Sequence, residues 1–460
     1  MRFLGIDIGS SFIKGAVLDL DELSLSHIER IPFPQPVSGL PPAFREFETA
    51  EVMVAVRRLI ERLIALAPEV SGILMCSQLH GCVLTREDGS AASRLINWQD
   101  QRALQPMPGQ VGSYFDQLQQ LISVEERRQL GNEPIPGVPV STLYWLTRTG
   151  SVPRHPVTVA ALPYFVVANL CGDAPKTDLT HAYGHGALNI ETLDWHRTVI
   201  SKLGLTDFSW PQIVAQGSVV GEWSHNGRTY PLFAPVGDYH CSQVGALLDD
   251  DELSINISTG SAVIQLAKGC ETGPFQTRPW FDGCYLKTIT HIPAGRALNA
   301  LVRLLGEVAQ LQGLSLRDPW EYLIRAAEQV PNTDLQVNPA FYFSSMGDRG
   351  SITNLCEENM TVGHLLRATF AGMAENYTKC AARIAPEHDW RQLVFSGGVA
   401  LKTTLLRQLI CERLGNNYRL APTEEDTLFG LLVLALAFQS ESGSVRQAMA
   451  HVRHHQPRPI

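Results

Sequence analysis

Apolar and polar residues alternate along the first part of the chain in a way that predicts strands and helices in turn. AEVMVAVRRLIERLIALA, residues 50–67, places apolar side chains at helical spacing, with its charges grouped away from them. GCVLTREDGS, residues 81–90, predicts a turn. Strand patterns occupy residues 3–9, 12–20, 25–33, 72–78 and 94–100. Strands that alternate with helices indicate an α/β fold.

The same kind of pattern restarts at Asp238 and gives a weak internal repeat of the first half. A helix pattern over Tyr239–Leu248 is followed by strand patterns around another small polar turn, and a helix pattern closes the chain at residues 424–438. Strand patterns occupy residues 252–260, 261–267, 284–290 and 392–398. We therefore expect two domains that meet near Gly245, residues 1–245 and 246–460, with the ligand site in a cleft between them. Residues 114–217, richer in helix and in loops, predict an insertion or lid on the first domain.

Length and composition narrow the class of protein. A chain of 460 residues is too long for one ordinary core, and a net charge of −9 argues against a nucleic-acid binder. The longest apolar run, residues 428–438, is too short to span a membrane and predicts a buried helix. The N-terminus lacks the apolar core of a signal peptide, and the nine cysteines are scattered without paired spacing. We therefore expect a cytoplasmic protein.

Three loops of small residues follow strands and have the chemistry of phosphate sites. DIGSSFIK (residues 7–14), ISTGSAV (257–263) and SGGVALKTTLL (396–406) each place glycine with hydroxyl residues or at a helix start. Asp7 can hold Mg²⁺ through water, and Lys14 can offset phosphate charge. Each loop alone is also compatible with an ordinary turn.

GDYHC, residues 237–241, raises the question of a metal site because an aspartate, a histidine and a cysteine lie close together. On a helix that begins at Asp238, Cys241 can share its face, whereas His240 projects roughly to the opposite side. The three side chains cannot readily converge on one metal ion, so packing is the better reading for His240 and Cys241.

In this order, the three loops resemble those of the FGGY carbohydrate kinases, a family within the actin, hexokinase and heat-shock chaperone superfamily. The resemblance extends over nearly the whole chain and implies two ribonuclease-H-like domains that flank a deep cleft, the first binding sugar and the second binding nucleotide. It implies ATP and Mg²⁺ as cofactors, Asp7 at the metal, and Gly430 as a site of close helix packing. The implied nucleotide-binding residues are Gly9, Ser10, Ser11, Lys14, Ser258, Thr259, Gly260, Ser261, Gly295, Gly397, Gly398 and Leu401. The chain departs from the family in PAGRAL, which keeps only Gly295 of a glycine pair, and in SGGVA, which lacks a third glycine.

The resemblance also assigns a sugar side and a catalytic base. CSQLHG and INWQDQR are similar to the family's substrate segments, which implies that Gln78, His80, Asp100 and Arg102 bind the sugar. The alternative is that His80 caps a turn while Asp100 and Arg102 form a surface pair. In the family, an aspartate at the position of Asp238 is the general base that accepts the proton of the sugar hydroxyl.

Within the family, several stretches look most like the sedoheptulokinase branch. The segment from residue 163 to 184 and Thr142, where many members have lysine, carry this likeness, and it places Asp178 and His181 near the sugar. Loop capping is the alternative for both. The implied reaction is transfer of the γ-phosphoryl group of ATP to a terminal hydroxyl of sedoheptulose, with a xylulokinase-type pentulose kinase as the alternative.

Two further classes stay open from the sequence: a non-catalytic sugar or nucleotide sensor and an ATP-driven clamp on the same fold. The partners that we expect are the sugar, ATP and a second copy of the chain in a homodimer, with no nucleic acid and no membrane.

Overall fold

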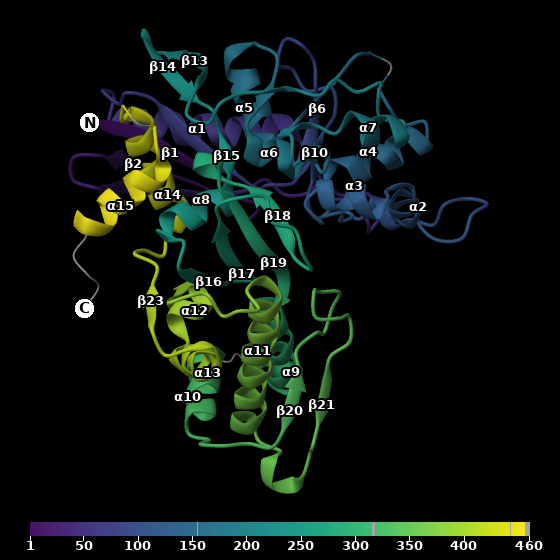
Figure 1. The fold of residues 1–460 in the computed structure, drawn as a ribbon, viewed down its shortest axis with the longest axis vertical. Coiled ribbons are helices and arrows are strands. Elements are labelled where there is room, and N and C mark those ends of the chain that lie inside the picture. The colour runs from purple at the N-terminus through teal and green to yellow at the C-terminus, as the bar shows by residue number, and fades with distance from the viewer. Residues whose placement is uncertain (154, 315–317, 442, 456–460) are drawn as a thin grey trace.

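The computed structural model describes residues 1–153, 155–314, 318–441 and 443–455 and divides them between an upper and a lower part (Figure 1). The upper part is built on a mixed sheet in which β1 pairs antiparallel with β2 and parallel with β5. β2 continues antiparallel to β3, and β15 runs parallel to β5 on its other side. The strands of this sheet are β1 (Arg2–Ile8), β2 (Phe12–Asp19), β3 (Ser24–Pro32), β5 (Ile73–Ser77), β13 (Val219–His225), β14 (Arg228–Phe233) and β15 (Val236–Gly237).

The lower part is built on a second mixed sheet with the same order of pairings. β16 pairs antiparallel with β17 and parallel with β22, and β17 continues antiparallel to β19. The strands are β16 (Glu252–Ile257), β17 (Gly260–Ala267), β18 (Gln276–Pro279), β19 (Tyr285–Pro293), β22 (Gln392–Ser396) and β23 (Tyr418–Leu420). The weak repeat in the sequence therefore corresponds to two sheets that share one topology, and DIGSSFIK and ISTGS occupy the same turn in each.

Helices cover both sheets because their apolar stripes need a partner surface. α1 buries Val52, Val56, Leu59 and Leu63, at helical spacing, against the first sheet, as the sequence pattern predicts. The helices of the upper part are α1 (Thr49–Leu66), α2 (Tyr114–Leu121), α3 (Val124–Gln129), α4 (Pro139–Arg148), α5 (Leu162–Cys171), α6 (Leu179–Gly184) and α7 (Arg197–Lys202). α8 (Asp238–Gly245) follows β15, and the later helices are α9 (Gly295–Leu311), α10 (Pro319–Glu328), α11 (Val362–Ile384), α12 (Gly398–Lys402), α13 (Thr404–Leu414), α14 (Asp426–Gln439) and α15 (Val445–His455).

The predicted insertion, residues 114–217, contains α2 to α7 and has an apolar core that it shares with its neighbours. Beside it lies a four-stranded sheet of β4 (Glu46–Phe47), β6 (Gly81–Thr85), β7 (Leu95–Asn97) and β8 (Thr158–Ala160). Among the described residues there are also three two-stranded pairs: β9 (Lys176–Thr177) with β12 (Gln212–Ile213), β10 (Leu188–Asn189) with β11 (Asp194–Trp195), and β20 (Gln336–Asn338) with β21 (Ser351–Thr353). The turn predicted for residues 81–90 is wrong in its first half, because residues 81–85 form β6.

α8 and α14 cross at very short range inside the core that joins the two sheets. A Cβ atom built on Gly245 would lie 1.9 Å from the Asp426 carbonyl oxygen, and one on Gly430 would lie 2.1 Å from the Cys241 carbonyl oxygen. Only glycine permits this approach. The close packing expected at Gly430 is therefore confirmed, and the crossing fixes the start of α14 against the end of α8.

The last long helix also lies against the first sheet, so the chain returns to the upper part at its end. α14 contacts β1, β2, β3 and β5, and Figure 1 shows α14 and α15 beside β1 and β2. Residues 428–438 lie within α14 and are almost wholly buried, which confirms the predicted buried helix. In the described part of the chain, no helix is long and apolar enough to cross a membrane. The predicted domain division near Gly245 stays a prediction.

Candidate active site

Three neighbouring parallel strands of the first sheet bring the predicted metal, sugar and base residues to one edge. The register of β1 on β5 places Asp7 opposite Cys76, and the register of β15 on β5 places Gly237 opposite Ser77. Gln78 follows β5 and Asp238 follows β15, so both come at the edge where β1 ends. The carboxyl ends of parallel strands are a common place for ligand sites.

Asp7 is held at the end of β1 by the beginning of α14. The Thr427 hydroxyl donates a hydrogen bond of 2.7 Å to Asp7 Oδ2, and Lys14 Nζ lies 3.9 Å from the same oxygen. Lys14 Nζ also lies 3.3 Å from Glu425 Oε2, and Arg30 pairs with the other oxygen of Glu425. Asp7 Oδ1 is buried and has no hydrogen-bond partner among the described residues. Burial raises the pKa of Asp7, so its charge favours a nearby cation.

Asp238 and Asp426 add two more carboxyl groups to this edge, each in the first turn of its helix. Asp238 is half-buried and accepts a 2.7 Å hydrogen bond from the Tyr239 N–H. Burial and the Asp7 charge raise the pKa of Asp238 to about 7. Burial raises the pKa of Asp426 to about 6, and Asp7 adds to that rise. Asp7 therefore lies close enough to both other carboxyl groups to affect their ionisation. The acidic groups of the site outnumber the nearby cation, Lys14.

The second and third predicted phosphate loops meet around the ISTGS turn of the lower sheet. The Gly295 N–H donates to the Ser258 carbonyl at 3.0 Å, and the Arg296 N–H donates to the Thr259 carbonyl at 2.8 Å. Gly397, with φ +85°, packs so closely that a Cβ atom on it would lie 2.5 Å from the Ile257 carbonyl oxygen. The structure thus brings together most of the predicted nucleotide residues of the second half.

The exposure of these loop residues differs in a way that matters for binding. Thr259, Gly260 and Gly398 are exposed, as is Ser11 in the first loop, where Gly9 and Ser10 are half-buried. Leu401 is half-buried in α12. Ser261 is buried, and its hydroxyl donates to the Ile292 carbonyl and accepts from Tyr377. Ser261 is therefore engaged within the protein and Gly295 is buried, whereas Ser11, Thr259, Gly260 and Gly398 lie where a ligand can reach them.

Gln78 lies at the sheet edge beside Asp238, and His80 follows two residues later in the sequence. His80 Nδ1 donates to the Gly184 carbonyl at 2.8 Å, because a carbonyl can only accept, and His80 Nε2 lies 3.5 Å from Glu133 Oε1. Gln78 Oε1 accepts from the Asn97 amide at 2.7 Å, whereas its Nε2 is buried with no partner in the part that the structure describes. His80 therefore fastens its loop to the end of α6 and does not cap its own turn.

Asp100 and Arg102 form a closed, buried pair. Asp100 accepts hydrogen bonds from Arg102 Nε and Nη2, both at 2.8 Å, and from the Arg45 N–H at 2.7 Å. Arg102 also donates to Glu46 Oε1 at 2.6 Å and stacks on the Phe44 ring at 4.2 Å. The alternative of a surface pair is wrong, because Asp100 is 0% and Arg102 is 3% exposed. Direct contact of the pair with a sugar stays a prediction.

Asp178 and His181 are also buried, and they hydrogen-bond to each other. Asp178 caps α6: its carboxylate accepts from the N–H groups of Thr180 and His181, from the Thr180 hydroxyl and from the His181 ring. The Thr180 hydroxyl in turn accepts a 2.8 Å hydrogen bond from the Gly237 N–H. Asp178 is therefore linked, through Thr180, to the residue that precedes Asp238. The contacts of Asp178 are those of a helix cap, as the alternative predicts. Its direct contact with the sugar stays a prediction.

His240 and Cys241 have separate surroundings. Cys241 Sγ donates to the Thr427 carbonyl at 3.2 Å on the α14 side. His240 is fully buried, and burial lowers its pKa to about 3. Both contribute to packing around Asp238.

Several residues of this edge escape sequence reasoning. The predicted closing helix begins with the polar residues Glu425, Asp426 and Thr427. Its long apolar run predicts burial and gives no sign that these first residues belong to a site. Glu133 and Arg278 form a buried pair across 145 residues of sequence. No local pattern could have paired them.

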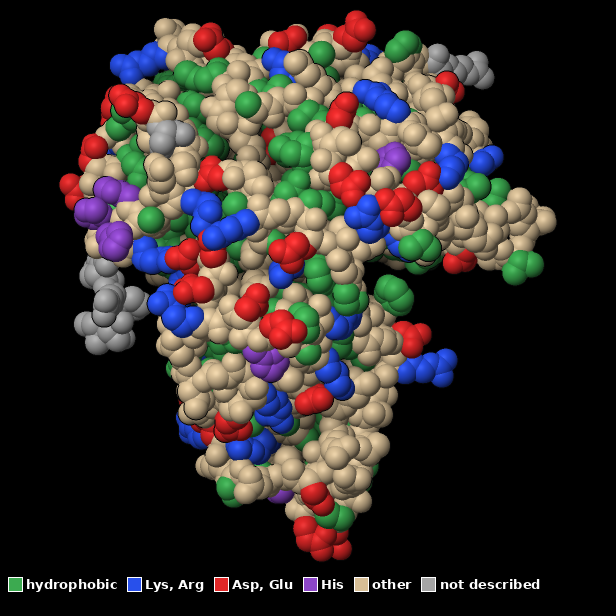
Figure 2. Space-filling model, viewed as in Figure 1, with side chains coloured by type: hydrophobic (Ala, Val, Ile, Leu, Met, Phe, Trp, Pro, Cys, Tyr) green, Lys and Arg blue, Asp and Glu red, His purple; other side chains and the backbone are tan. Residues whose placement is uncertain are grey.

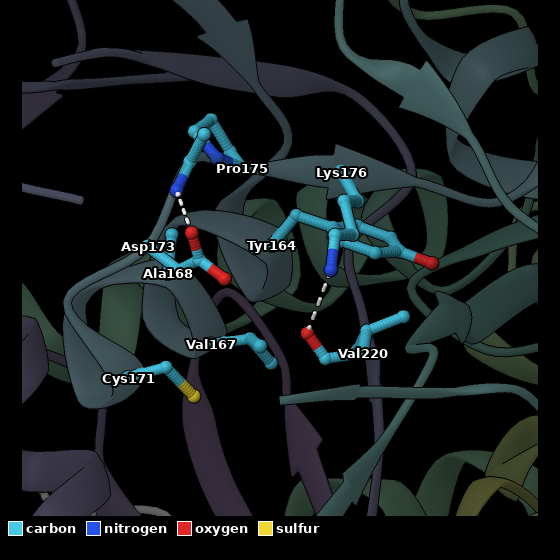
Figure 3. Close-up of a pocket in the computed structure, with 9 residues that line it drawn as sticks. Tyr164, Val167, Ala168, Cys171, Asp173, Pro175, Lys176 and Val220 are labelled. Atoms are coloured by element: carbon cyan, nitrogen blue, oxygen red, sulfur yellow. Dashed lines mark hydrogen bonds between the residues drawn. The ribbon is translucent and has the colours of Figure 1, made fainter. Parts of the chain in front are cut away.

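A notch and a small pocket on the described part of the molecule differ in kind. Figure 2 shows a notch between the region of α2 and the lower part of the molecule. Figure 3 shows a small pocket beside α5, where Lys176 Nζ donates to the Val220 carbonyl at 3.2 Å. Its lining consists of Tyr164, Val167, Ala168, Cys171, Asp173, Ala174, Pro175, Lys176 and Val220, none of them a predicted site residue.

Comparison with known proteins shows which family the chain resembles. The N-terminal domain model of the FGGY family of carbohydrate kinases matches residues 2–230. Sedoheptulokinase from Mus musculus is 25% identical over 456 residues, covering 88% of this chain and 91% of the relative. Xylulose kinase from Staphylococcus epidermidis is 23% identical over 459 residues, covering 94% of this chain and 87% of the relative.

Solved structures share the fold over almost the whole chain. Gluconate kinase from Lactobacillus acidophilus superposes with a TM-score of 0.82 at 18% identity, covering 97% of this chain and 92% of that one. Plasmodium falciparum glycerol kinase with ADP gives a TM-score of 0.80 at 17% identity, with the same coverage. The predicted fold is therefore confirmed.

The chain belongs to the FGGY family of carbohydrate kinases. It is a sugar kinase, a phosphotransferase whose family uses ATP. Membership in this family favours an enzyme over the two other classes that the sequence alone leaves open, the sensor and the clamp.

Gly397 offers a direct test of the nucleotide loops. Alanine at this position meets both an unfavourable φ and the Ile257 carbonyl, so the ISTGS turn must shift. We expect Gly397→Ala to raise the KM for ATP by about tenfold or more, because backbone placement sets phosphate contacts. Steady-state kinetics measure this.

The matched control is Gly415→Ala, where φ is +115° but no atom lies within 4 Å of the new Cβ. It should affect stability while it leaves the KM for ATP unchanged. Equal KM values for ATP in both variants would contradict the assignment of this loop.

Proposed function

We propose that this sugar kinase transfers the γ-phosphoryl group of ATP to a terminal hydroxyl of sedoheptulose, giving sedoheptulose 7-phosphate, with Asp238 as the general base. The observation that carries the proposal is the shared edge of β1, β5 and β15, where Asp7, Gln78 and Asp238 come together. A half-buried carboxyl group with a pKa of about 7 suits a general base that works near neutral pH.

In the proposed mechanism, the phosphates of ATP lie between the DIGSSFIK and ISTGS turns. Asp238 accepts the proton of the sugar hydroxyl while the hydroxyl oxygen forms its bond to the γ-phosphorus. The bond between the γ-phosphorus and the β-γ bridging oxygen breaks, and ADP leaves with that oxygen. Lys14, which faces Asp7 and Glu425, offsets charge on the phosphates.

The acidic edge fits a magnesium ion. Asp7 Oδ1 is a buried carboxylate oxygen without a partner in the described ranges, and Asp238 and Asp426 add further negative charge. Within those ranges, no three His, Cys, Asp or Glu side chains are grouped closely enough to hold a metal alone. Magnesium bound through one or two carboxylates and several waters suits such a site. When bound, Mg²⁺ neutralises charge on the transferred phosphoryl group.

The choice of sugar rests on similarity. Sedoheptulokinase relatives from Mus musculus and Homo sapiens each cover 88% of this chain. Xylulose kinases are also similar over much of the chain, so a pentulose kinase is the second candidate. Both substrates are ketoses with a terminal hydroxyl.

A substrate panel tests the proposal. We expect Mg-ATP-dependent ADP formation with sedoheptulose to exceed that with D-xylulose, D-ribulose, L-ribulose, glycerol and gluconate. Asp238→Asn should lower kcat by roughly 10²- to 10⁴-fold, the usual contribution of a general base. A higher rate with D-xylulose would select the second candidate, and an Asp238→Asn variant with wild-type kcat would remove the assigned base.

Thermal unfolding controls for misfolding of this variant. The folded-state pKa of Asp238, about 7, lies above its ordinary value of 3.8, so ionisation costs stability as pH rises toward 7. Asparagine stays neutral and removes this cost. At pH 8 without magnesium, Asp238→Asn should therefore unfold at the same temperature as the wild type or at a higher one.

The pH dependence of kcat/KM gives an independent prediction. Asp238 must be ionised to accept a proton, and burial together with Asp7 raises its pKa to about 7. We expect kcat/KM to fall about tenfold per pH unit below this pKa and to level off above it. A profile that stays flat from pH 5 to 8 would contradict the role of Asp238.

A further inference from the structure

A buried ion pair joins the two parts of the molecule beside the sugar side of the site. Arg278 on β18 pairs through Nη2 with Glu133 Oε1, in the loop between α3 and α4, and the two residues are only 3% and 5% exposed. Backbone contacts support the pair: the Thr277 N–H donates to the Gly131 carbonyl at 3.0 Å. The Asn132 side-chain Nδ2 donates to the Gly273 carbonyl at 3.0 Å. The pair is therefore held in place from both sides.

The remaining contacts of the pair lead to the predicted sugar residue and to the base. Glu133 Oε2 accepts a 2.5 Å hydrogen bond from the Tyr183 hydroxyl, and Glu133 Oε1 lies 3.5 Å from His80 Nε2. The Arg278 guanidinium lies 4.3 Å from the centroid of the Tyr239 ring, and Tyr239 directly follows Asp238. Glu133 thus touches His80, and Arg278 stacks on the neighbour of Asp238.

The charge of this pair bears on which substrates the site can accept. A lone guanidinium beside a sugar site attracts carboxylates, because its fork of donors matches their oxygens. Arg278 keeps one such donor, since its Nε has no hydrogen-bond partner within the described residues. Glu133 supplies the opposite charge, so the pair as a whole is neutral. A neutral wall favours an uncharged polyol over an acid.

Resting on the proposed function, we propose that Glu133 is a specificity-determining residue: it neutralises Arg278 and so makes the sugar site select uncharged ketoses over aldonic acids. The carboxylates Asp7, Asp238 and Asp426 at the adjacent edge act in the same direction, because they repel an anionic substrate. Removing the Glu133 charge exposes the Arg278 cation to the substrate. The change should therefore favour anionic sugars, which a merely structural role would not do.

The test compares binding of sedoheptulose and gluconate by calorimetry without nucleotide, in the wild type and in three variants. Glu133→Gln keeps the shape and a hydrogen bond to Tyr183 but loses the charge. We expect it to improve the affinity for gluconate relative to sedoheptulose by about tenfold or more. Arg278→Met removes the cation and should not improve the relative affinity for gluconate.

Glu126→Gln is the matched control. Glu126 lies on α3, in the same region of the chain, and pairs with Lys202 Nζ at 2.6 Å and 2.7 Å. This variant loses a partly buried ion pair of the same kind, far from His80 in the contact network. It should lower the unfolding temperature and leave the ratio of the two affinities unchanged.

The outcomes separate this inference from the proposed function. An unchanged affinity ratio in Glu133→Gln, with sedoheptulose still bound and phosphorylated, overturns the role of Glu133 alone. Tighter binding of gluconate than of sedoheptulose by the wild type overturns the selection of neutral sugars and also the choice of sedoheptulose. A wild type that binds neither compound overturns both proposals. A ratio that shifts toward gluconate only in Glu133→Gln supports the inference.

Discussion

The close crossing of α8 and α14 is the constraint on which the rest of the site depends. Gly245 and Gly430 leave room for the backbone of the facing helix, and a methyl group at either position would collide with a carbonyl oxygen. The crossing holds the start of α14 against α8, and the hydrogen bond from Thr427 to Asp7 places Asp426 near the end of β1. Asp238 comes to the same edge because it follows β15. Because α14 lies about 420 residues from β1 in the sequence, the site forms only when these distant segments come together.

The charges around this crossing are arranged in two different ways. At the sheet edge, burial and the charge of Asp7 raise the pKa values of Asp238 and Asp426, and the three carboxyl groups suit a bound cation and a proton acceptor. On the sugar side, Glu133 and Arg278 balance each other. Removing one partner of such a buried pair costs roughly 3–5 kcal/mol of stability, because the remaining charge stays buried without a counter-charge. The sheet edge thus carries several carboxyl groups, whereas the Glu133–Arg278 pair on the sugar side is neutral overall.

Much of the fold could be predicted from the sequence because it depends on local patterns. The strand-turn-strand units around Gly9 and Gly260 and the helix at residues 50–67 follow from apolar periodicity and glycine position. The strand at 81–85 was missed because its apolar run is short and leads directly into the turn residues Asp88 and Gly89. Local pattern cannot separate a short buried strand from the turn beside it.

Candidate site residues could be predicted from the sequence only where they belong to a recognisable motif. The phosphate loops and Asp238 stand in recognisable segments, whereas Glu133 and Arg278 are single charges in unrelated stretches that the fold brings together. Asp100 and Arg102 show the converse: their spacing suggested a surface pair or sugar ligands, and the fold surrounds them with Glu46, Phe44 and Arg45. Which polar side chains are closed off within the protein depends on tertiary contacts.

The ionisation of Asp238 is the measurement that tests this account most directly. Carbon NMR of protein labelled at the aspartate side-chain carboxyl carbons, titrated from pH 4 to 9 without magnesium, reports each carboxyl group separately. The account predicts a resonance that titrates near pH 7 and is missing in Asp238→Asn. If every aspartate resonance of the wild type titrates below about pH 5, near the ordinary range of this side chain, Asp238 is not the poised base described here.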